Sequence, residues 1–195
     1  LAKVLLPKDY IRYKLSGELG MDLSDAAGTL LCDVKAEAWS TELMDKLELD
    51  PSIMPPVLKS INVVGTVTST AAEKTGLSTS TKIVAGGADN ACGSVGSGII
   101  KAGRVMVSLG SSGVVVAQTD QAEADPEGRI HLFNHAVPGS YYMMGVMLSA
   151  GMSFKWLKEE MYNDQLDYET LNEEAAAVEA GSEDLIFLPY LNGER

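Results

Sequence analysis

Cysteine, histidine and basic residues are all scarce in this chain of 195 residues. It has two cysteines, two histidines, and 15 Lys and Arg against 27 Asp and Glu, which gives a formal net charge of −12. Cys32 and Cys92 lie far apart and outside any CxxC pair, so neither a disulfide framework nor a structural zinc site is expected. The shortage of basic residues argues against nucleic acid as a general partner, because no basic stripe is available for a phosphate backbone.

Long apolar runs are also absent. No run approaches the roughly 18–20 residues that a membrane helix needs, and no charged-then-apolar secretory leader is present. We therefore expect no membrane partner and a reducing, cytoplasmic location. Hydrophobic residues make up 46% of the chain and charged residues 22%, a globular composition that can form a core. Because an acidic protein repels anions, any site for an anionic ligand must use backbone amides or a metal ion.

The two ends of the sequence suggest that it belongs to something longer. The chain begins with Leu1 rather than Met and ends on the polar run Asn192-Gly193-Glu194-Arg195. We expect an internal segment of a longer protein, so that part of any active site lies outside these residues.

The residue pattern predicts a mixed α/β chain in two parts. Apolar spacing, prolines, glycines and capping residues place helices at 4–15, 40–49, 69–75, 91–100, 148–162 and 168–180. β-rich runs place strands at 63–67, 82–87, 104–109, 113–117, 131–137, 141–146 and 185–190. The sequence becomes rich in β-forming residues after Lys101-Ala102-Gly103, so we place a domain boundary there, between residues 1–100 and 101–195.

Asp89 is the first candidate for chemistry. It follows a predicted buried strand and the pair Gly86-Gly87, and ligands of open α/β sheets bind beyond the carboxyl ends of strands. A carboxylate there can take a proton from a substrate hydroxyl or hold a metal. The alternative is that Asp89 only caps the helix that begins near Ala91. The density of glycines around it favours a functional site.

The second candidate is the turn Gly110-Ser111-Ser112-Gly113. Exposed amides in a Gly/Ser turn can form an anion-binding nest, and the hydroxyls add donors. Taken alone, an ordinary tight hairpin explains the segment better, and GxxxxGK[ST] is absent. His131 and His135 lack the acidic residue of an HExxH pattern, so no metal pair is predicted. For Cys92 we expect a buried packing role.

Seven motifs in one order resemble the FGGY carbohydrate kinases. They are Leu6-Pro7-Lys8-Asp9-Tyr10, Asp22 with Ser24 to Thr29, Gly86 to Ala91, Ser108 to Gly113, His135 to Gly139, Gly145 to Gly151, and Pro189 to Arg195. The match covers essentially the whole chain. Within the family it is closest to the kinases that act on D-xylulose. Several separated motifs in one order are far more specific than a single glycine loop.

The resemblance implies an actin-like ATPase (ribonuclease H-like) fold, with the end of the first, sugar-binding domain at 1–100 and the start of the second, ATP-binding domain at 101–195. It implies transfer of the γ-phosphoryl of ATP, with Mg²⁺, to a sugar hydroxyl, most simply D-xylulose to D-xylulose 5-phosphate. Asp89 would then be the general base and Asn90 a sugar ligand. Gly110, Ser111, Ser112 and Gly113 would meet the ATP phosphates. No residue is assigned to a metal, and a homodimer is compatible with the resemblance.

The sequence departs from the family at two positions and leaves alternatives open. Ser111 stands where the family commonly has Thr, and Met152 follows Gly151 where relatives often have a second Gly. The family's first phosphate loop and adenine segment have no counterpart here, so we expect no turnover from these 195 residues alone. The alternatives are a kinase for ribulose, gluconate or glycerol, and a non-catalytic actin-like nucleotide-binding protein.

Overall fold

The computed structural model describes residues 2–194, and the chain forms two compact units. Unit 1 contains the residues up to Met106 together with Val116–Met144, and unit 2 contains Val107–Val115 and the residues from Gly145 on. Within residues 2–194, no helix has the length and apolar character needed to cross a membrane.

The helices of unit 1 are α1 (Pro7–Ser16), α2 (Leu23–Gly28), α3 (Thr41–Lys46), a 3-10 helix (Pro51–Ile53), α4 (Ser69–Thr75) and α5 (Asp89–Gly96). They include the four that the sequence predicted, with α5 starting and ending earlier than expected, and one short α-helix, α2, that was not predicted. Pro7 occupies the first turn of α1, where its missing N–H costs nothing. Ser40 caps α3 by accepting a hydrogen bond from the Leu43 N–H. Gly76 ends α4 in the left-handed conformation (φ 76°), which favours glycine.

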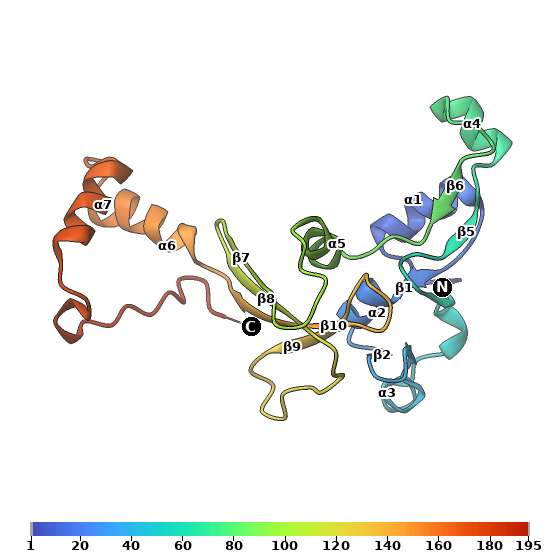
Figure 1. The fold of residues 1–195 in the computed structure, drawn as a ribbon, viewed down its shortest axis with the longest axis horizontal. Helices are drawn as coiled ribbons and strands as arrows, with labels where there is room; N and C mark the ends of the chain where they lie inside the picture. The colour runs from blue at the N-terminus through green and yellow to red at the C-terminus, as the bar shows by residue number, and fades with distance from the viewer. Residues whose placement is uncertain (1, 195) are drawn as a thin grey trace. The chain divides into compact units, whose positions relative to one another are not determined.

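Short strand pairs connect these helices (Figure 1). The strands are β1 (Met21–Asp22), β2 (Cys32–Asp33), β3 (Ala38–Trp39), β4 (Val57–Leu58), β5 (Val63–Thr66) and β6 (Lys82–Val84). β1 and β4 are parallel, whereas β2–β3 and β5–β6 are antiparallel. A strand forms within the predicted range 82–87, but it is shorter and is not buried. β6 pairs with β5 in a two-stranded sheet and leaves Val84 51% exposed.

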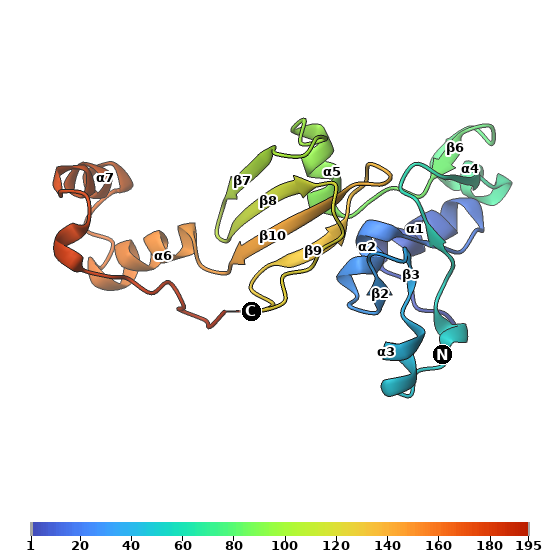
Figure 2. The ribbon, with the colours of Figure 1, turned by 60° about the horizontal axis from the view of Figure 1, so that its bottom comes forward.

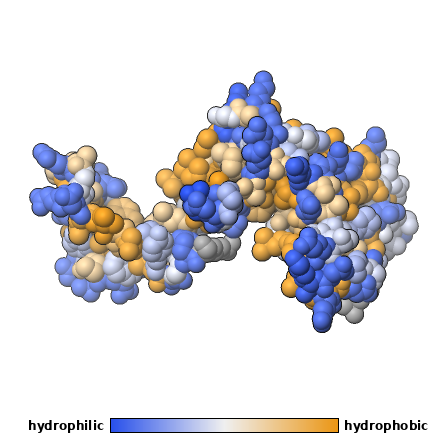
Figure 3. All heavy atoms as spheres, turned by 90° about the horizontal axis from the view of Figure 1, so that it is seen from below, coloured by the Kyte–Doolittle hydropathy of each residue, from blue (hydrophilic) through white to orange (hydrophobic). Residues whose placement is uncertain are grey.

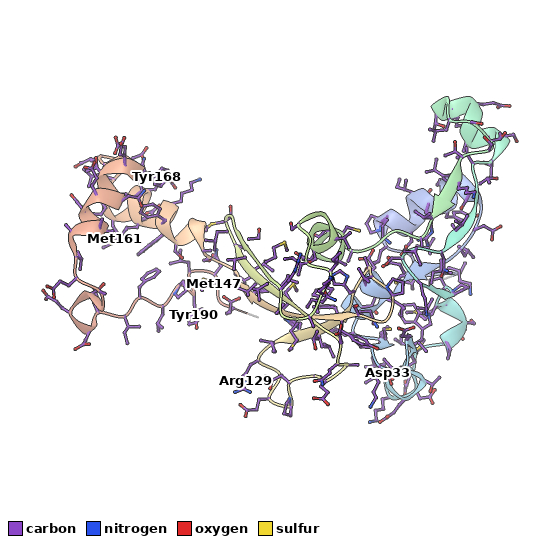
Figure 4. The ribbon with its side chains drawn as sticks, in the orientation of Figure 1. Asp33, Arg129, Met147, Met161, Tyr168 and Tyr190 are labelled. Carbon is purple, nitrogen blue, oxygen red and sulfur yellow. The ribbon has the colours of Figure 1, made fainter. Side chains whose placement is uncertain are left out.

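The predicted β-rich segment forms a four-stranded sheet. Its order is β7 (Val105–Leu109), β8 (Gly113–Thr119), β10 (Tyr141–Met147) and β9 (His131–Asn134), as Figure 2 shows. β9 and β10 are antiparallel, with Tyr142 opposite Phe133. The acidic loop between β8 and β9 carries Arg129 (Figure 4), whose Nε forms an ion pair of 3.0 Å with Asp125 Oδ2.

Unit 2 contains α6 (Gly151–Trp156), a π-helix (Leu157–Met161), α7 (Tyr168–Ala177) and a 3-10 helix (Ser182–Asp184). A helix was predicted over 148–162. The observed helix begins three residues later, at Gly151, and changes from an α-helix to a π-helix at Leu157. Aromatic rings hold the unit together, with Phe154 against Tyr168 at 5.2 Å and Trp156 stacked on Phe187 at 6.1 Å between ring centroids. The strand predicted over 185–190 is wrong, because no strand is formed at those residues.

The hydrophobic core lies in unit 1. Its most deeply buried apolar side chains include Met21, Met44, Ala91 and Val116, all completely shielded from solvent. Much apolar surface nevertheless stays exposed, as the orange patches of Figure 3 show. Leu109 of β7 is 80% exposed, and Leu185 and Ile186 are 81% and 80% exposed.

Candidate active site

Asp89 lies at the start of α5, with its carboxylate exposed to solvent. The N-cap of α5 is Ala88, so Asp89 is the first residue inside the helix, and the alternative that it caps a helix starting at Ala91 is wrong. Its Oδ1 accepts hydrogen bonds from the backbone N–H of Asn90 at 2.7 Å and from Asn90 Nδ2 at 3.3 Å. Among the described residues Oδ2 has no hydrogen-bond donor. One oxygen is thus held in place while the other is available to a ligand.

The turn that leads to Asp89 is anchored by the buried side chain of Arg12. Arg12 Nη1 donates to the Ala85 carbonyl oxygen at 2.8 Å, and Nη2 donates to the Gly20 carbonyl oxygen. The same guanidinium pairs with the fully buried Asp9 carboxylate at 3.2 Å. Gly86 follows in the left-handed region (φ 79°), a conformation that favours glycine.

A second anchor comes from α2. Ser24 Oγ accepts a hydrogen bond from the Ala88 N–H at 2.8 Å and donates one to Asp22 Oδ1. Asp22 also caps α2 by accepting from the N–H groups of Ser24 and Asp25 at 3.0 and 3.3 Å. Space around the turn is tight, because a Cβ built on Gly87 would lie 3.3 Å from Ser24 Oγ.

Lys8 neutralises part of the acidic cluster beneath this turn. Its ammonium group contacts Asp22 directly and lies 3.1 Å from Asp25 and 3.5 Å from Asp9. Burial lowers the pKa of Lys8, but hydrogen bonds and charges from Asp22 and Asp25 outweigh it and leave the pKa above its usual value. Burial raises the pKa of Asp25, and Lys8 only partly offsets this. Without the positive charge of Lys8, the carboxylates of this cluster would therefore be costly to ionise.

Tyr142 is a buried residue under the electrostatic influence of Asp89, and sequence reasoning missed it. It is 2% exposed, stacks on Phe133 at 5.2 Å and meets the ring of His135 edge-on at 5.8 Å. Burial raises the pKa of the Tyr142 phenol, and the negative charges of Asp89 and Asp25 raise it further. The only local signal was a tyrosine in a β-rich run, which does not reveal what it packs against.

In unit 2, the turn Gly110-Ser111-Ser112-Gly113 lies at the beginning of α6. The carbonyl oxygens of Gly110 and Ser111 accept hydrogen bonds from the N–H groups of Gly151 and Ala150, both at 2.9 Å. Ser112 Oγ donates to the Leu148 carbonyl oxygen at 2.9 Å. The turn's carbonyl oxygens are thus used to satisfy the first N–H groups of α6.

This arrangement leaves particular donors of the turn unused. Among residues 2–194, neither Ser111 nor Ser112 spends its backbone N–H on a hydrogen bond, and the Ser111 hydroxyl is also unpaired and exposed. Gly110 uses its own N–H for the Ser112 carbonyl at 2.9 Å. Two amides and one hydroxyl are therefore free to bind an anion.

The histidines and Cys92 lie in different surroundings in the structure. Within the part of the chain that is described, no group of three or more His, Cys, Asp and Glu side chains could hold a metal ion. His131 and His135 differ in surroundings, since His131 is exposed and His135 is 4% exposed. The buried packing role expected for Cys92 is wrong, because the residue is exposed.

Comparison with known protein families decides what this arrangement belongs to. Residues 1–96 match the N-terminal domain of the FGGY family of carbohydrate kinases, and residues 105–195 match its C-terminal domain. The two matches together cover most of the chain. The chain belongs to the FGGY family of carbohydrate kinases.

Known relatives of this FGGY chain include sugar kinases over its whole length. It is 41% identical to a xylulose kinase from Bacillus subtilis, over 100% of the chain and 39% of that protein. A solved xylulose kinase from Rhodospirillum rubrum is 31% identical with a TM-score of 0.90, over 99% of the chain and 40% of that structure. A solved gluconate kinase from Lactobacillus acidophilus is 29% identical with a TM-score of 0.92, over 100% of the chain and 39% of that structure.

These similarities confirm the predicted family and fold class. The FGGY chain has the α/β, actin-like fold of the sugar kinases that it matches. It spans about two fifths of the length of these relatives.

Proposed function

We propose that the protein containing this chain transfers the γ-phosphoryl group of ATP to a hydroxyl of D-xylulose and forms D-xylulose 5-phosphate. Membership of the FGGY family and the similarity to xylulose kinases support this activity. The observation that carries it is the Asp89 carboxylate, exposed at the start of α5 directly after an anchored turn, with Oδ2 free among the described residues. A carboxylate in that state can accept a proton, which is the chemistry that an attacking sugar hydroxyl requires.

In this proposal Asp89 is the general base. Its Oδ2 accepts the proton of the attacking hydroxyl, while the Asn90 N–H holds Oδ1 at 2.7 Å and limits rotation of the carboxylate. Asn90 contributes to sugar binding, because its side-chain carbonyl has no partner among the described residues and can accept from a sugar hydroxyl. Phosphoryl transfer depends mainly on positioning and electrostatics, so a carboxylate held this way is suited to it.

The ATP phosphates are assigned to the turn of unit 2. The free N–H groups of Ser111 and Ser112 and the Ser111 hydroxyl donate to phosphate oxygens, and Gly110 and Gly113 shape the turn. A side chain at Gly113 would come within 3.2 Å of the Ala150 Cβ, so glycine permits the close packing seen there. Mg²⁺ bound to ATP would neutralise phosphate charge, and no residue of the described chain is assigned to that ion.

The direct test is a coupled assay of ADP release with the full-length protein and a panel of sugars. Asp89→Asn keeps the size of the side chain at the first position of α5 but removes its ability to accept a proton. We expect kcat on D-xylulose to fall by about 10²–10⁴-fold, which is the usual contribution of a general base. Asp120→Asn is the matched control, because Asp120 is an exposed acid in the loop between β8 and β9.

Each outcome of the panel leads to a different conclusion. D-Xylulose activity that disappears in Asp89→Asn supports both the substrate and the base. Activity on D-gluconate, ribulose or glycerol would keep the mechanism and change the sugar, and the gluconate kinase of similar fold makes gluconate the first alternative. Absence of sugar-dependent ADP release in the wild type would favour a non-catalytic nucleotide-binding protein.

The domain boundary near Lys101-Ala102-Gly103 is part of the same proposal. The two family matches stop at residue 96 and resume at residue 105, which supports a junction between them. Limited proteolysis of the full-length protein should cleave near this exposed segment. The cytoplasmic location and the homodimer stay predictions, and sedimentation of the purified protein would test the second.

A further inference from the structure

Ser24 has no role in the proposed chemistry, yet it connects two segments on which the site depends. It is the second residue of α2 and is 1% exposed. Its hydroxyl proton goes to Asp22 Oδ1, so a lone pair of the same oxygen remains for the Ala88 N–H at 2.8 Å. Asp22 is itself fully buried and paired with Lys8. The direction of the Ser24 hydroxyl is therefore determined by a charged partner.

The turn that Ser24 contacts is weak in its own local structure. Gly86 and Gly87 precede Ala88, and glycine has more backbone freedom to lose than any other residue. Ala88 is the N-cap of α5 but provides no side-chain capping bond. Hydrogen bonds from outside compensate, with Arg12 holding the Ala85 carbonyl at one end and Ser24 holding the Ala88 N–H at the other.

Asp89 is the next residue after the Ser24 contact. A shift of the Ala88 amide changes where α5 begins, and so changes where the Asp89 carboxylate lies. Misplacement of a reacting group by about 1 Å can lower a rate by about 10²-fold. Loss of the hydrogen bond to Ala88 is therefore expected to shift the Asp89 carboxylate slightly and to lower kcat strongly.

We propose that Ser24 is a positioning residue for the general base, acting through its hydrogen bond to the Ala88 N–H. Ser24 does not bind sugar or ATP in this proposal. It sets the start of α5, and with it the direction from which Asp89 approaches the attacking hydroxyl. This inference rests on the proposed function of Asp89.

The test compares two buried serines of unit 1 in the full-length protein. Ser16 Oγ donates to the Arg12 carbonyl at 2.9 Å and accepts from the Glu18 N–H at 3.1 Å, so it matches Ser24 in burial and in number of bonds. Neither Ser16 bond reaches the turn before Asp89. We expect Ser24→Ala to lower kcat by roughly 10–100-fold with KM for ATP unchanged. Ser16→Ala should lower the urea midpoint of unfolding about as much as Ser24→Ala does, but it should keep kcat within about twofold of the wild type.

Two additional variants separate positioning from general damage. Ser24→Cys fills nearly the same space with a weaker hydrogen-bonding group and should lower kcat in the same direction, so a cavity would not be the cause. In an Asp89→Asn background, Ser24→Ala should cause little further loss of kcat, because a misplaced base and a missing base are not additive.

The results that overturn the inference differ from those that overturn the proposed function. Two results would show that Ser24 does not act through Asp89. One is a Ser24→Ala variant with the same kcat as Ser16→Ala, and the other is a Ser24→Ala change that lowers kcat in the Asp89→Asn background as much as it does in the wild type. If Asp89→Asn keeps the kcat of the wild type, then Asp89 is not the general base, and Ser24 has no base to position.

Discussion

Gly151 donates its backbone N–H to the Gly110 carbonyl oxygen at 2.9 Å, and a Cβ built on Gly151 would lie only 2.6 Å from that same oxygen. The neighbouring atom is backbone and cannot rotate away. The start of α6 and the Ser111 turn are therefore in contact at a distance that only glycine permits. A side chain at position 151 must displace one of them.

We expect Gly151→Ala to move the phosphate turn and to lower kcat/KM for ATP by about tenfold or more. It should also destabilise the protein by about 1–3 kcal/mol, the usual cost of overpacking. Gly145→Ala is the matched control, because a Cβ at Gly145 of β10 would meet nothing within 4 Å. Steady-state kinetics with varied ATP and a urea titration measure both effects. Equal behaviour of the two variants would show that the turn tolerates displacement.

Gly87 makes the corresponding close approach in unit 1. Its added Cβ would lie 3.0 Å from Cys92 Sγ and 3.4 Å from the Ala136 Cβ. Gly87→Ala should therefore lower both stability and kcat on the sugar, because the turn before Asp89 must shift. Gly87→Ala combined with Cys92→Ala should recover much of the loss, since the nearest atom is removed. Gly93→Ala, in the open part of α5, should instead stabilise the helix by about 1 kcal/mol.

Local signals in the sequence predicted where α1, α3 and α4 begin or end, but not the short helix α2. Pro7, Ser40 and Gly76 each act on their own neighbours, so their positions reveal where helices begin or end. The hairpin of β7 and β8 and the pair of β9 and β10 were also predicted, because glycine turns separate β-rich runs.

Features that depend on distant partners could not be predicted in this way. Ser24 and Ala88 are 64 positions apart, and nothing in either segment names the other. The apolar run at 185–190 has the composition of a strand, but a strand needs a neighbour, and Leu185 remains 81% exposed. Asp89 was a candidate from its place after a strand and two glycines, and Ser111 from its Gly/Ser turn, whereas their free donor and acceptor atoms are visible only in the structure.

The two cysteines should differ strongly in reactivity. Burial, together with the charges of Asp33 and Glu37, raises the pKa of the Cys32 thiol to about 11. The thiolate is the reactive form, so Cys32 should react slowly at pH 8, whereas Cys92 is exposed. Alkylation with iodoacetamide followed by peptide mass spectrometry should therefore modify Cys92 first. Cys92→Ser should remove the fast phase and Cys32→Ser should leave it, and the reverse pattern would contradict the burial of Cys32.

His135 should make stability depend on pH. Burial lowers its pKa below the usual 6.5, and only a backbone hydrogen bond at Ile99 opposes this. Its ring Nδ1 accepts from the Val137 N–H at 3.0 Å. A depressed pKa in the folded state means that the neutral ring stabilises the fold above pH 6.5. That contribution is lost as the pH falls through the lower, folded-state value.

We therefore expect the free energy of unfolding to contain a component that declines below pH 6.5, by at most about 1.4 kcal/mol per pH unit for one proton. His135→Gln should remove this component and flatten the profile between pH 7.5 and 5, apart from a constant offset for the lost ring contacts with Tyr142. His131→Gln is the control, since His131 is exposed on β9. Urea titrations at half-unit pH steps measure the slopes. Parallel profiles for the wild type and His135→Gln would mean that the ring is protonated in the fold without penalty, and that its burial does not control the acid limit of this unit.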